Sequence, residues 1–154
     1  MISKDDVILA QKKWSDGLLE IVGKHINNLD YVSCASDFID RLYDYQNCEV
    51  LFKPTLARDI QFRKSKDAAL SYFVSGNNSF PEDKGFALKK WTNVRWENSG
   101  IQIFDSLALA MGNYYFTNSE GVTKVDFITF KVRLLWSDRS IYPFLWRALR
   151  WSSI

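Results

Sequence analysis

The chain has 154 residues, a length typical of one domain that spans residues 1–154 and buries a hydrophobic core. Hydrophobic residues make up 47% and charged residues 25%, as in soluble globular proteins, and this balance argues against a disordered or fibrous chain. Lysine and arginine number 20 and aspartate and glutamate 18, so the net charge of +2 favours neither nucleic-acid binding nor binding to a membrane surface.

Helical periodicity dominates the first half of the chain, where apolar residues recur every three or four positions. Ser3 and Asp6 have the spacing of a capping box, and Ser65 is a typical N-cap residue. The stretch 77–85 is rich in Asn, Ser, Pro and Gly, which is typical of a loop. Helices are predicted over residues 3–25, 31–43 and 65–76.

The period changes to two after Gly85, as expected for strands. Turn residues at 98–100, 118–121 and 138–140 divide this region, and Pro143 places the last strand at an edge or a bulge. Strands are predicted over residues 50–52, 60–62, 85–97, 101–104, 107–117, 122–134 and 141–153. Helices followed by long antiparallel strands indicate an α+β fold, with three helices covering one face of a curved sheet. The aromatic content of 16% suits a cone-shaped domain with an aromatic pocket between the two layers.

Few residues offer metal or redox chemistry. Cys34 and Cys48 are isolated thiols without a CxxC spacing, so no metal site, redox pair or cofactor is expected. The single histidine, His25, is in phase with the apolar side of the first helix, and is either a core or rim histidine or a pocket acid or base. No apolar run approaches the ~18 residues of a membrane span, and the N-terminus is unlike a signal peptide. We therefore expect a cytoplasmic protein or, in an alga, a plastid protein that has lost its transit peptide.

Six longer phrases carry a more specific signal because they occur together in one order. They are Val-Leu-Phe-Lys-Pro-Thr (50–55), Gln-Phe-Arg (61–63), Ala-Leu-Ser-Tyr-Phe-Val (69–74), Glu-Asp-Lys-Gly-Phe-Ala (82–87), Trp-Thr-Asn-Val-Arg (91–95) and Ala-Leu-Ala-Met-Gly-Asn-Tyr-Tyr-Phe-Thr (108–117). In these phrases and in its last residues the chain resembles the iota-class carbonic anhydrases of algae, cyanobacteria and other bacteria. That family is built on the association domain of calcium/calmodulin-dependent protein kinase II, within the nuclear transport factor 2-like group.

The resemblance implies a nuclear transport factor 2-like fold, a homodimer formed through the sheet, and reversible hydration of carbon dioxide to bicarbonate, typically without a metal. It does not imply calmodulin binding. The family's Lys-Pro-Thr threonine falls on Thr55, its Ser-Tyr-Phe tyrosine on Tyr72, and the second serine of its closing His-His-Ser-Ser phrase on Ser153. These three are predicted to be catalytic and to bind the substrate. Arg150 and Trp151 replace the two histidines, and Trp151 is predicted to line the substrate pocket.

Hydroxyl groups can orient water and bicarbonate, but none has an ordinary pKa near neutrality, tyrosine's being about 10. Residues two apart on a strand face the same way, so Trp151 and Ser153 are expected to share one space, where the indole replaces the family's proton acceptor. The sequence therefore predicts a carbonic anhydrase weakened by Trp151. The alternative is a non-catalytic dimeric binding module whose pocket Trp151 plugs. An enzyme of the polyketide-cyclase or ketosteroid-isomerase kind ranks third, because the carboxylates fall mostly on predicted surfaces and turns.

The predicted strands contain three tryptophans, Trp91, Trp96 and Trp136. Together they give the sheet more aromatic surface than one helical layer can cover. This surplus predicts, independently of the resemblance, that the open face of the sheet forms a homodimer. Three cationic residues are expected to be solvated, with a lesser expectation that one of them borders the pocket and attracts bicarbonate: Lys53, Arg63 and Arg95.

Overall fold

The computed structural model describes residues 2–105, 107–132 and 145–147; for residues 130–132 and 145–147 it describes the backbone only. The helices are α1 (Lys4–Ile26), α2 (Tyr31–Leu42), α3 (Lys66–Val74) and the 3₁₀ helix η1 (Phe86–Lys89). The strands are β1 (Phe52–Lys53), β2 (Asn93–Phe104), β3 (Leu107–Asn118), β4 (Gly121–Val132) and β5 (Leu145–Arg147).

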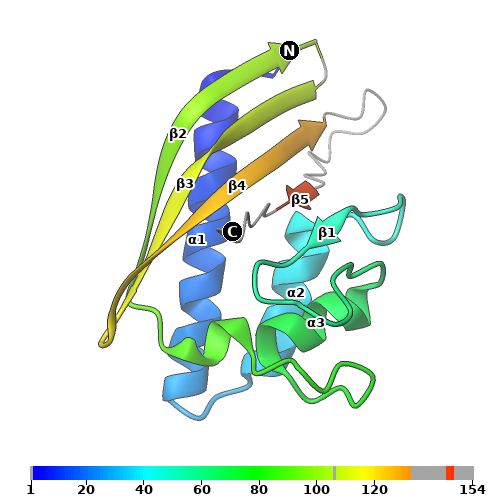
Figure 1. Ribbon diagram of the computed structural model, residues 1–154, viewed down its shortest axis with the longest axis vertical. Coiled ribbons are helices and arrows are strands. Elements are labelled where there is room, and N and C mark those ends of the chain that lie inside the picture. Colours follow the sequence, from blue (N-terminus) through cyan, green and yellow to red (C-terminus); the bar gives the residue numbers. More distant parts are fainter. Residues whose placement is uncertain (1, 106, 133–144, 148–154) are drawn as a thin grey trace, which may run out of the picture.

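The strands form one sheet in the order β1-β5-β4-β3-β2. The long strands β2, β3 and β4 pair antiparallel and curve together, while α1 runs along one face of this sheet (Figure 1). The short strand β1 is the exception, since it pairs parallel with β5. The predicted α+β class, with three helices packed on an open antiparallel sheet, is confirmed.

The helices begin where their capping residues predict. The Ser3 side chain accepts a hydrogen bond from the Asp6 backbone N–H, and the Asp6 carboxylate accepts one from the Ser3 backbone, which completes the predicted capping box. The Ser65 hydroxyl accepts from the Ala68 backbone N–H at the start of α3. Capping groups of this kind satisfy backbone donors that a helix leaves free at its first turn.

Trp14 of α1 lies at the centre of the aromatic core. Its ring packs edge-on against Trp96 and Tyr114 of the sheet, with ring centroids 5.8 and 6.1 Å away. It also contacts Phe38 of α2 and Phe73 of α3, at 6.0 and 6.5 Å. Tilted and edge-on pairs are the favourable geometries for aromatic rings, so one indole joins all three helices to the sheet.

One predicted strand is wrong, and the strand predicted over residues 85–97 begins only at Asn93. Residues 60–62 form no strand, and the Ile60 backbone N–H donates instead to Glu82 Oε1 at 3.1 Å. Residues 86–89 form η1, and the indole Nε1 of Trp91 donates to the Phe86 carbonyl at 2.8 Å. A short alternation of apolar and polar residues fits a buried helical turn as well as it fits a strand, so the sequence could not separate them.

The predicted turn at residues 98–100 is a β-bulge inside β2, where the register against β3 shifts between Asn98 and Gly100. Gly112 of β3 faces this bulge, and a Cβ at that position would overlap the Glu97 carbonyl oxygen. A bulge adds local bend and twist to a strand. The glycine therefore permits the close approach of two strands at the bend of the sheet.

The two described tryptophans among those chosen as evidence for a dimer do not lie on the open face. Trp91 is 5% exposed, and Trp96 stacks on Tyr114 and donates to the Ser15 hydroxyl of α1 at 2.6 Å. Trp136 lies outside the described residues. The outer face of the sheet carries Met111 instead, half exposed on the side opposite Tyr114.

Candidate active site

Three hydroxyl groups from distant parts of the chain line one small cavity, here called the inner cavity. They belong to Thr55, Tyr72 and Tyr114. The remaining described lining consists mostly of aromatic rings and comprises Trp14, Phe52, Lys53, Pro54, Phe73 and Phe86. The space open to the centre of a water molecule is about 10 Å³, which is close to what one water molecule requires. The inner cavity is therefore a small aromatic chamber with a cluster of hydroxyls.

Thr55 stands in a turn directly after β1. Pro54 lacks a backbone N–H and cannot extend the strand pairing, so the chain turns there. The backbone of the next residue, Leu56, hydrogen-bonds to the phenol oxygen of Tyr72 on α3. The same tyrosine ring packs edge-on against Phe52 of β1, with ring centroids 5.9 Å apart. The turn that carries Thr55 is thus tied to the helix that carries Tyr72.

Tyr114 enters the inner cavity from β3. Its hydroxyl oxygen lies 3.4 Å from Thr55 Oγ1, and the side chain is 4% exposed. Ala108, Ala110 and Phe116 are buried on the same face of β3, as the period of two requires. Small residues therefore precede Tyr114 along the strand, and its ring is the first large group on this face.

Burial sets the protonation of the two phenols. It raises the pKa of Tyr72 well above its ordinary value, and the neighbouring Tyr114 adds to the rise, while the hydrogen bond from Leu56 opposes it. Burial likewise raises the pKa of Tyr114, against the opposing effect of the Thr55 hydroxyl. Both phenols keep their protons at neutral pH, so the inner cavity presents neutral hydrogen-bond donors.

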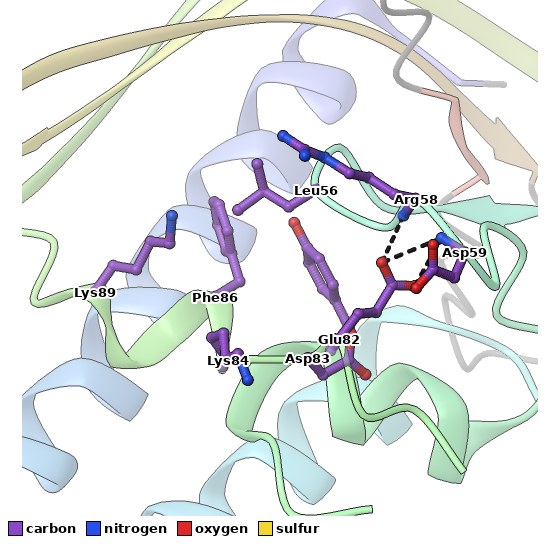
Figure 2. Close-up of a pocket in the computed structure, with 10 residues that line it drawn as sticks. Leu56, Arg58, Asp59, Glu82, Asp83, Lys84, Phe86 and Lys89 are labelled. Carbon is purple, nitrogen blue, oxygen red and sulfur yellow. Dashed lines mark hydrogen bonds between the residues drawn. The ribbon is translucent and has the colours of Figure 1, made fainter. Parts of the chain in front are cut away.

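A second, larger cavity adjoins the first and is here called the outer pocket (Figure 2). Its volume is about 560 Å³. Tyr72 and Phe86 line both cavities and so form part of the wall between them. The other lining residues are Leu56, Arg58, Asp59, Glu82, Asp83, Lys84, Gly85 and Lys89. In contrast to the inner cavity, the outer pocket is bordered mainly by charged side chains.

The Glu82 carboxylate is held by the loop opposite it. It accepts hydrogen bonds from the backbone N–H groups of Arg58, Asp59 and Ile60, at 2.7 to 3.2 Å, and Figure 2 shows it turned towards that loop. Burial alone would raise the pKa of Glu82, but these backbone bonds and the charge of Arg63 lower it below its ordinary value. Glu82 therefore fixes the shape of the pocket wall.

Asp83 and Arg63 form a buried ion pair behind the outer pocket. Arg63 Nη2 lies 2.7 Å from Asp83 Oδ1, and the Ser71 hydroxyl of α3 donates to Asp83 Oδ2 at 2.6 Å. The Arg63 side chain is fully buried and lies 4.2 Å from the centre of the Phe80 ring. The prediction that Arg63 is solvated is therefore wrong, and the expectation that carboxylates stay on surfaces fails for Asp83, whose side chain is 2% exposed.

The structure brings together two of the predicted site residues, Thr55 and Tyr72. Ser153 and Trp151 lie outside the described residues, so their place in the site stays a prediction. His25 lies at the end of α1 against the ring of Tyr31, with centroids 4.8 Å apart, and lines neither cavity. This is the rim position that its place in the helix allowed.

Cys34 and Cys48 are free thiols, the first buried and the second exposed. Within the described residues no group of three or more His, Cys, Asp or Glu side chains is arranged to hold a metal ion. None of the helices in this part of the chain has the length and hydropathy of a membrane span.

Sequence reasoning missed Tyr114 and wrongly expected Arg63 to be solvated. Tyr114 stands inside one of the six family-like phrases, but nothing in the phrase assigns it a role. Its place in an alternating strand, on the side of the buried alanines, was the available signal. Arg63 offered no such signal, because its partner Asp83 is 20 residues away in a loop.

The comparisons with known proteins agree on one class. A crystal structure described as the iota-carbonic anhydrase from a cyanobacterium, in complex with bicarbonate, superposes with a TM-score of 0.89 at 33% identity and covers 99% of this chain and 94% of its own. A metal-independent carbonic anhydrase of Nostoc sp. (strain PCC 7120) is 40% identical over 129 residues, which is 81% of this chain. The chain spans 63% of the length of that relative.

The family model of metal-independent carbonic anhydrases matches residues 5–134. The matched range contains Thr55, Tyr72 and Tyr114 and most of the described chain. The chain belongs to the metal-independent carbonic anhydrase family, and the resemblance to the iota class seen in the sequence is confirmed.

Proposed function

We propose that this protein catalyses the reversible hydration of carbon dioxide to bicarbonate in the inner cavity, using side-chain hydroxyls in place of a metal-bound water. The observation that carries the proposal is the meeting of Thr55 and Tyr72 in one small aromatic cavity of a chain that belongs to this family. The structural neighbour in complex with bicarbonate supports the same substrate.

Hydration of carbon dioxide requires a positioned water molecule and hydrogen-bond donors at the oxygen where negative charge develops. The water oxygen attacks the carbon of carbon dioxide, and one C=O electron pair moves onto oxygen, giving bicarbonate after a proton leaves the attacking water. Thr55 accepts a hydrogen bond from the attacking water and holds it in place. Tyr72 donates to the oxygen that gains charge, as a neutral phenol fixed in a site of low dielectric constant can do. The released proton goes to solvent or buffer.

Stopped-flow measurement of carbon dioxide hydration by the purified protein tests this proposal. The rate should exceed the buffer rate in proportion to protein concentration, and Thr55→Val should lower it while the fold is retained. Thr123→Val, an exposed threonine of β4, is the matched control and should leave the rate unchanged. A wild-type rate equal to that of buffer would refute the proposed activity.

A substitution at Trp151 distinguishes a weak enzyme from the alternative, a non-catalytic binding module. If Trp151 replaces the family's proton acceptor, Trp151→His should raise hydration by a good part of the ~10²–10⁴-fold that a positioned general base contributes. Ser153→Ala in that background should lower the rate again. A folded Trp151→His variant with unchanged hydration would remove Trp151 from the site.

We also propose a homodimer through the outer face of the sheet, on grounds other than the tryptophans. Met111 and Ile128 are register partners on the face turned away from the helices, and Met111 is 50% exposed. Phe104, 55% exposed, lies on the neighbouring strand. Sedimentation at micromolar concentration should give twice the monomer mass, and Met111→Lys should favour the monomer. A wild-type protein that sediments as a monomer would contradict the dimer.

A further inference from the structure

We propose that Tyr114 is a positioning residue for Thr55, donating a hydrogen bond to Thr55 Oγ1 so that the threonine's own proton points to the substrate. The inference rests on the proposed function, because it concerns the same cavity. It assigns a role to a residue that lies 59 positions from its partner in the sequence.

The geometry places the two oxygens within hydrogen-bond reach. Thr55 Oγ1 and the Tyr114 hydroxyl oxygen are 3.4 Å apart, which is long for a bond between hydroxyl groups. Hydrogen bonds of a catalytic site are often long before the substrate is bound. A phenol is far more acidic than an aliphatic alcohol, so the favourable direction is donation from Tyr114 to Thr55. Burial, which keeps the phenol protonated, maintains that direction across neutral pH.

The donor is the rigid member of the pair. The Tyr114 ring stacks on Trp96 with centroids 5.0 Å apart, and Phe116 and Phe127 contact it edge-on at 4.6 and 5.7 Å. A tyrosine has only two side-chain torsions, and close-packed rings hold both of them. Thr55, by contrast, stands in a turn and is partly exposed. The strand therefore supplies a fixed donor to a hydroxyl that stands in a turn.

The consequence for Thr55 follows from the valence of a hydroxyl group. A threonine hydroxyl has one proton and two acceptor positions. When Tyr114 fills one acceptor position, the Thr55 proton and the other acceptor position remain for water and bicarbonate. Without the Tyr114 hydroxyl, the Thr55 hydroxyl can rotate, and in some of its rotamers the proton points away from the substrate. Loss of one neutral hydrogen bond of this kind predicts about a three- to tenfold weaker interaction with bicarbonate.

The test uses Tyr114→Phe, which removes one oxygen and keeps the packed ring, with Tyr115→Phe as the matched control. Tyr115 is the next residue of β3 and faces the opposite side of the sheet, where it contacts Arg95. Bicarbonate affinity, measured by ¹³C NMR titration, and carbon dioxide hydration, measured by stopped flow, are recorded for both variants. Tyr114→Phe should lower both about three- to tenfold, and Tyr115→Phe should lower neither.

A double-variant cycle separates positioning from mere packing. If Tyr114 acts through Thr55, Tyr114→Phe should have no further effect on bicarbonate affinity in a Thr55→Val background. Equal effects in both backgrounds, or an unchanged affinity in the single variant, would overturn the proposal. If the wild type binds bicarbonate but hydrates no carbon dioxide, the proposed function fails alone and the affinity cycle still decides the role of Tyr114. If the wild type does neither, both proposals fall together.

Discussion

The inner cavity and the outer pocket share a wall but differ in chemistry. The inner cavity offers three neutral hydroxyls among aromatic rings, with Lys53 its single charged residue among those described. The outer pocket is many times larger and carries three cationic and three acidic side chains. Tyr72 and Phe86 belong to both. Under the proposed function, the neutral donors of the inner cavity would act on the reacting atoms, and the charges of the outer pocket would attract the anion and stabilise the surrounding structure.

Burial explains why the two regions can differ so much within a short distance. A charge taken out of water needs a partner and further hydrogen bonds. The acidic residues of the outer pocket obtain them, since Asp83 pairs with Arg63 and Glu82 accepts three backbone N–H groups. Neutral hydroxyls need only one partner each, so they can stand in the smaller cavity. The predictions below test whether the two regions respond to different changes.

The largest expected effect is on stability and comes from the ion pair behind the outer pocket. Arg63→Met should lower the free energy of unfolding by about 3–5 kcal/mol, because it leaves the Asp83 carboxylate buried without its cation. Arg41→Met on α2, where the arginine side chain is 62% exposed, should change it by less than about 0.5 kcal/mol. Urea unfolding of both variants measures the difference. A loss as small as that of the control would mean that the buried pair contributes nothing to the pocket wall.

A comparable loss in activity, with a smaller loss in stability, is expected at the shared wall. Tyr72→Phe removes the proposed oxyanion donor and should lower the rate of carbon dioxide hydration by about 10²–10³-fold. Tyr45→Phe is the matched control, since its hydroxyl donates to the Arg63 carbonyl at 2.8 Å and lies outside both cavities. Both variants lose one buried hydrogen bond, so their melting temperatures should fall alike, while only the first should lose activity. Equal hydration rates for Tyr72→Phe and Tyr45→Phe would show that Tyr72 is not the oxyanion donor.

How much of this division the sequence could predict depends on the distance between partners. Helices α1 and α3 were predictable because periodicity and capping residues are local signals. Strands β3 and β4 were predictable for the same reason, since alternation and turn residues bound them. The pocket position of Thr55 and Tyr72 came from the resemblance to a family and not from periodicity, because no local rule brings two such residues together.

The features that the sequence could not predict depend on contacts between distant residues. The buried guanidinium of Arg63 finds its carboxylate 20 residues away, and the Tyr114 hydroxyl meets Thr55 across 59 residues. The strand expected at residues 60–62 fails for a related reason, because Glu82 binds the backbone there. The sequence shows that a residue is charged or can donate a hydrogen bond, but only the fold shows which distant residue is its partner.

A smaller effect should come from the open side of the outer pocket. Lys84 and Lys89 line it, and replacing both with glutamine should raise the KM for bicarbonate about two- to fivefold, the effect of an exposed charge pair. The kcat should change little, and 0.5 M salt should remove most of the difference, since salt screens exposed charges. Lys4→Gln with Lys12→Gln, on α1, makes the same change in net charge far from the pocket and should leave KM unchanged. An effect that persists at high salt would argue against an electrostatic role.

The smallest effect concerns acid stability and tests whether Glu82 serves the wall of the outer pocket. The backbone N–H groups around it hold the pKa of Glu82 below its ordinary value, against the opposing effect of burial. A carboxyl whose folded pKa is lowered contributes stability above its unfolded pKa of about 4.3 and loses that contribution as the pH falls through the folded value. The melting temperature of Glu82→Gln should therefore lie below that of the wild type at pH 7, and the gap should narrow towards pH 3.

Asn77→Ala is the matched control for this experiment. The Asn77 side chain accepts a hydrogen bond from the Ser79 backbone N–H at 2.9 Å, but it does not titrate. The difference in melting temperature between Asn77→Ala and the wild type should therefore be the same at pH 7 and pH 3, whereas the difference for Glu82→Gln should narrow. Differential scanning calorimetry at both pH values measures the two gaps. A Glu82→Gln gap that stays constant with pH would show that the backbone bonds, and not the charge, hold this wall, and the outer pocket would then resemble the inner cavity more closely than its composition suggests.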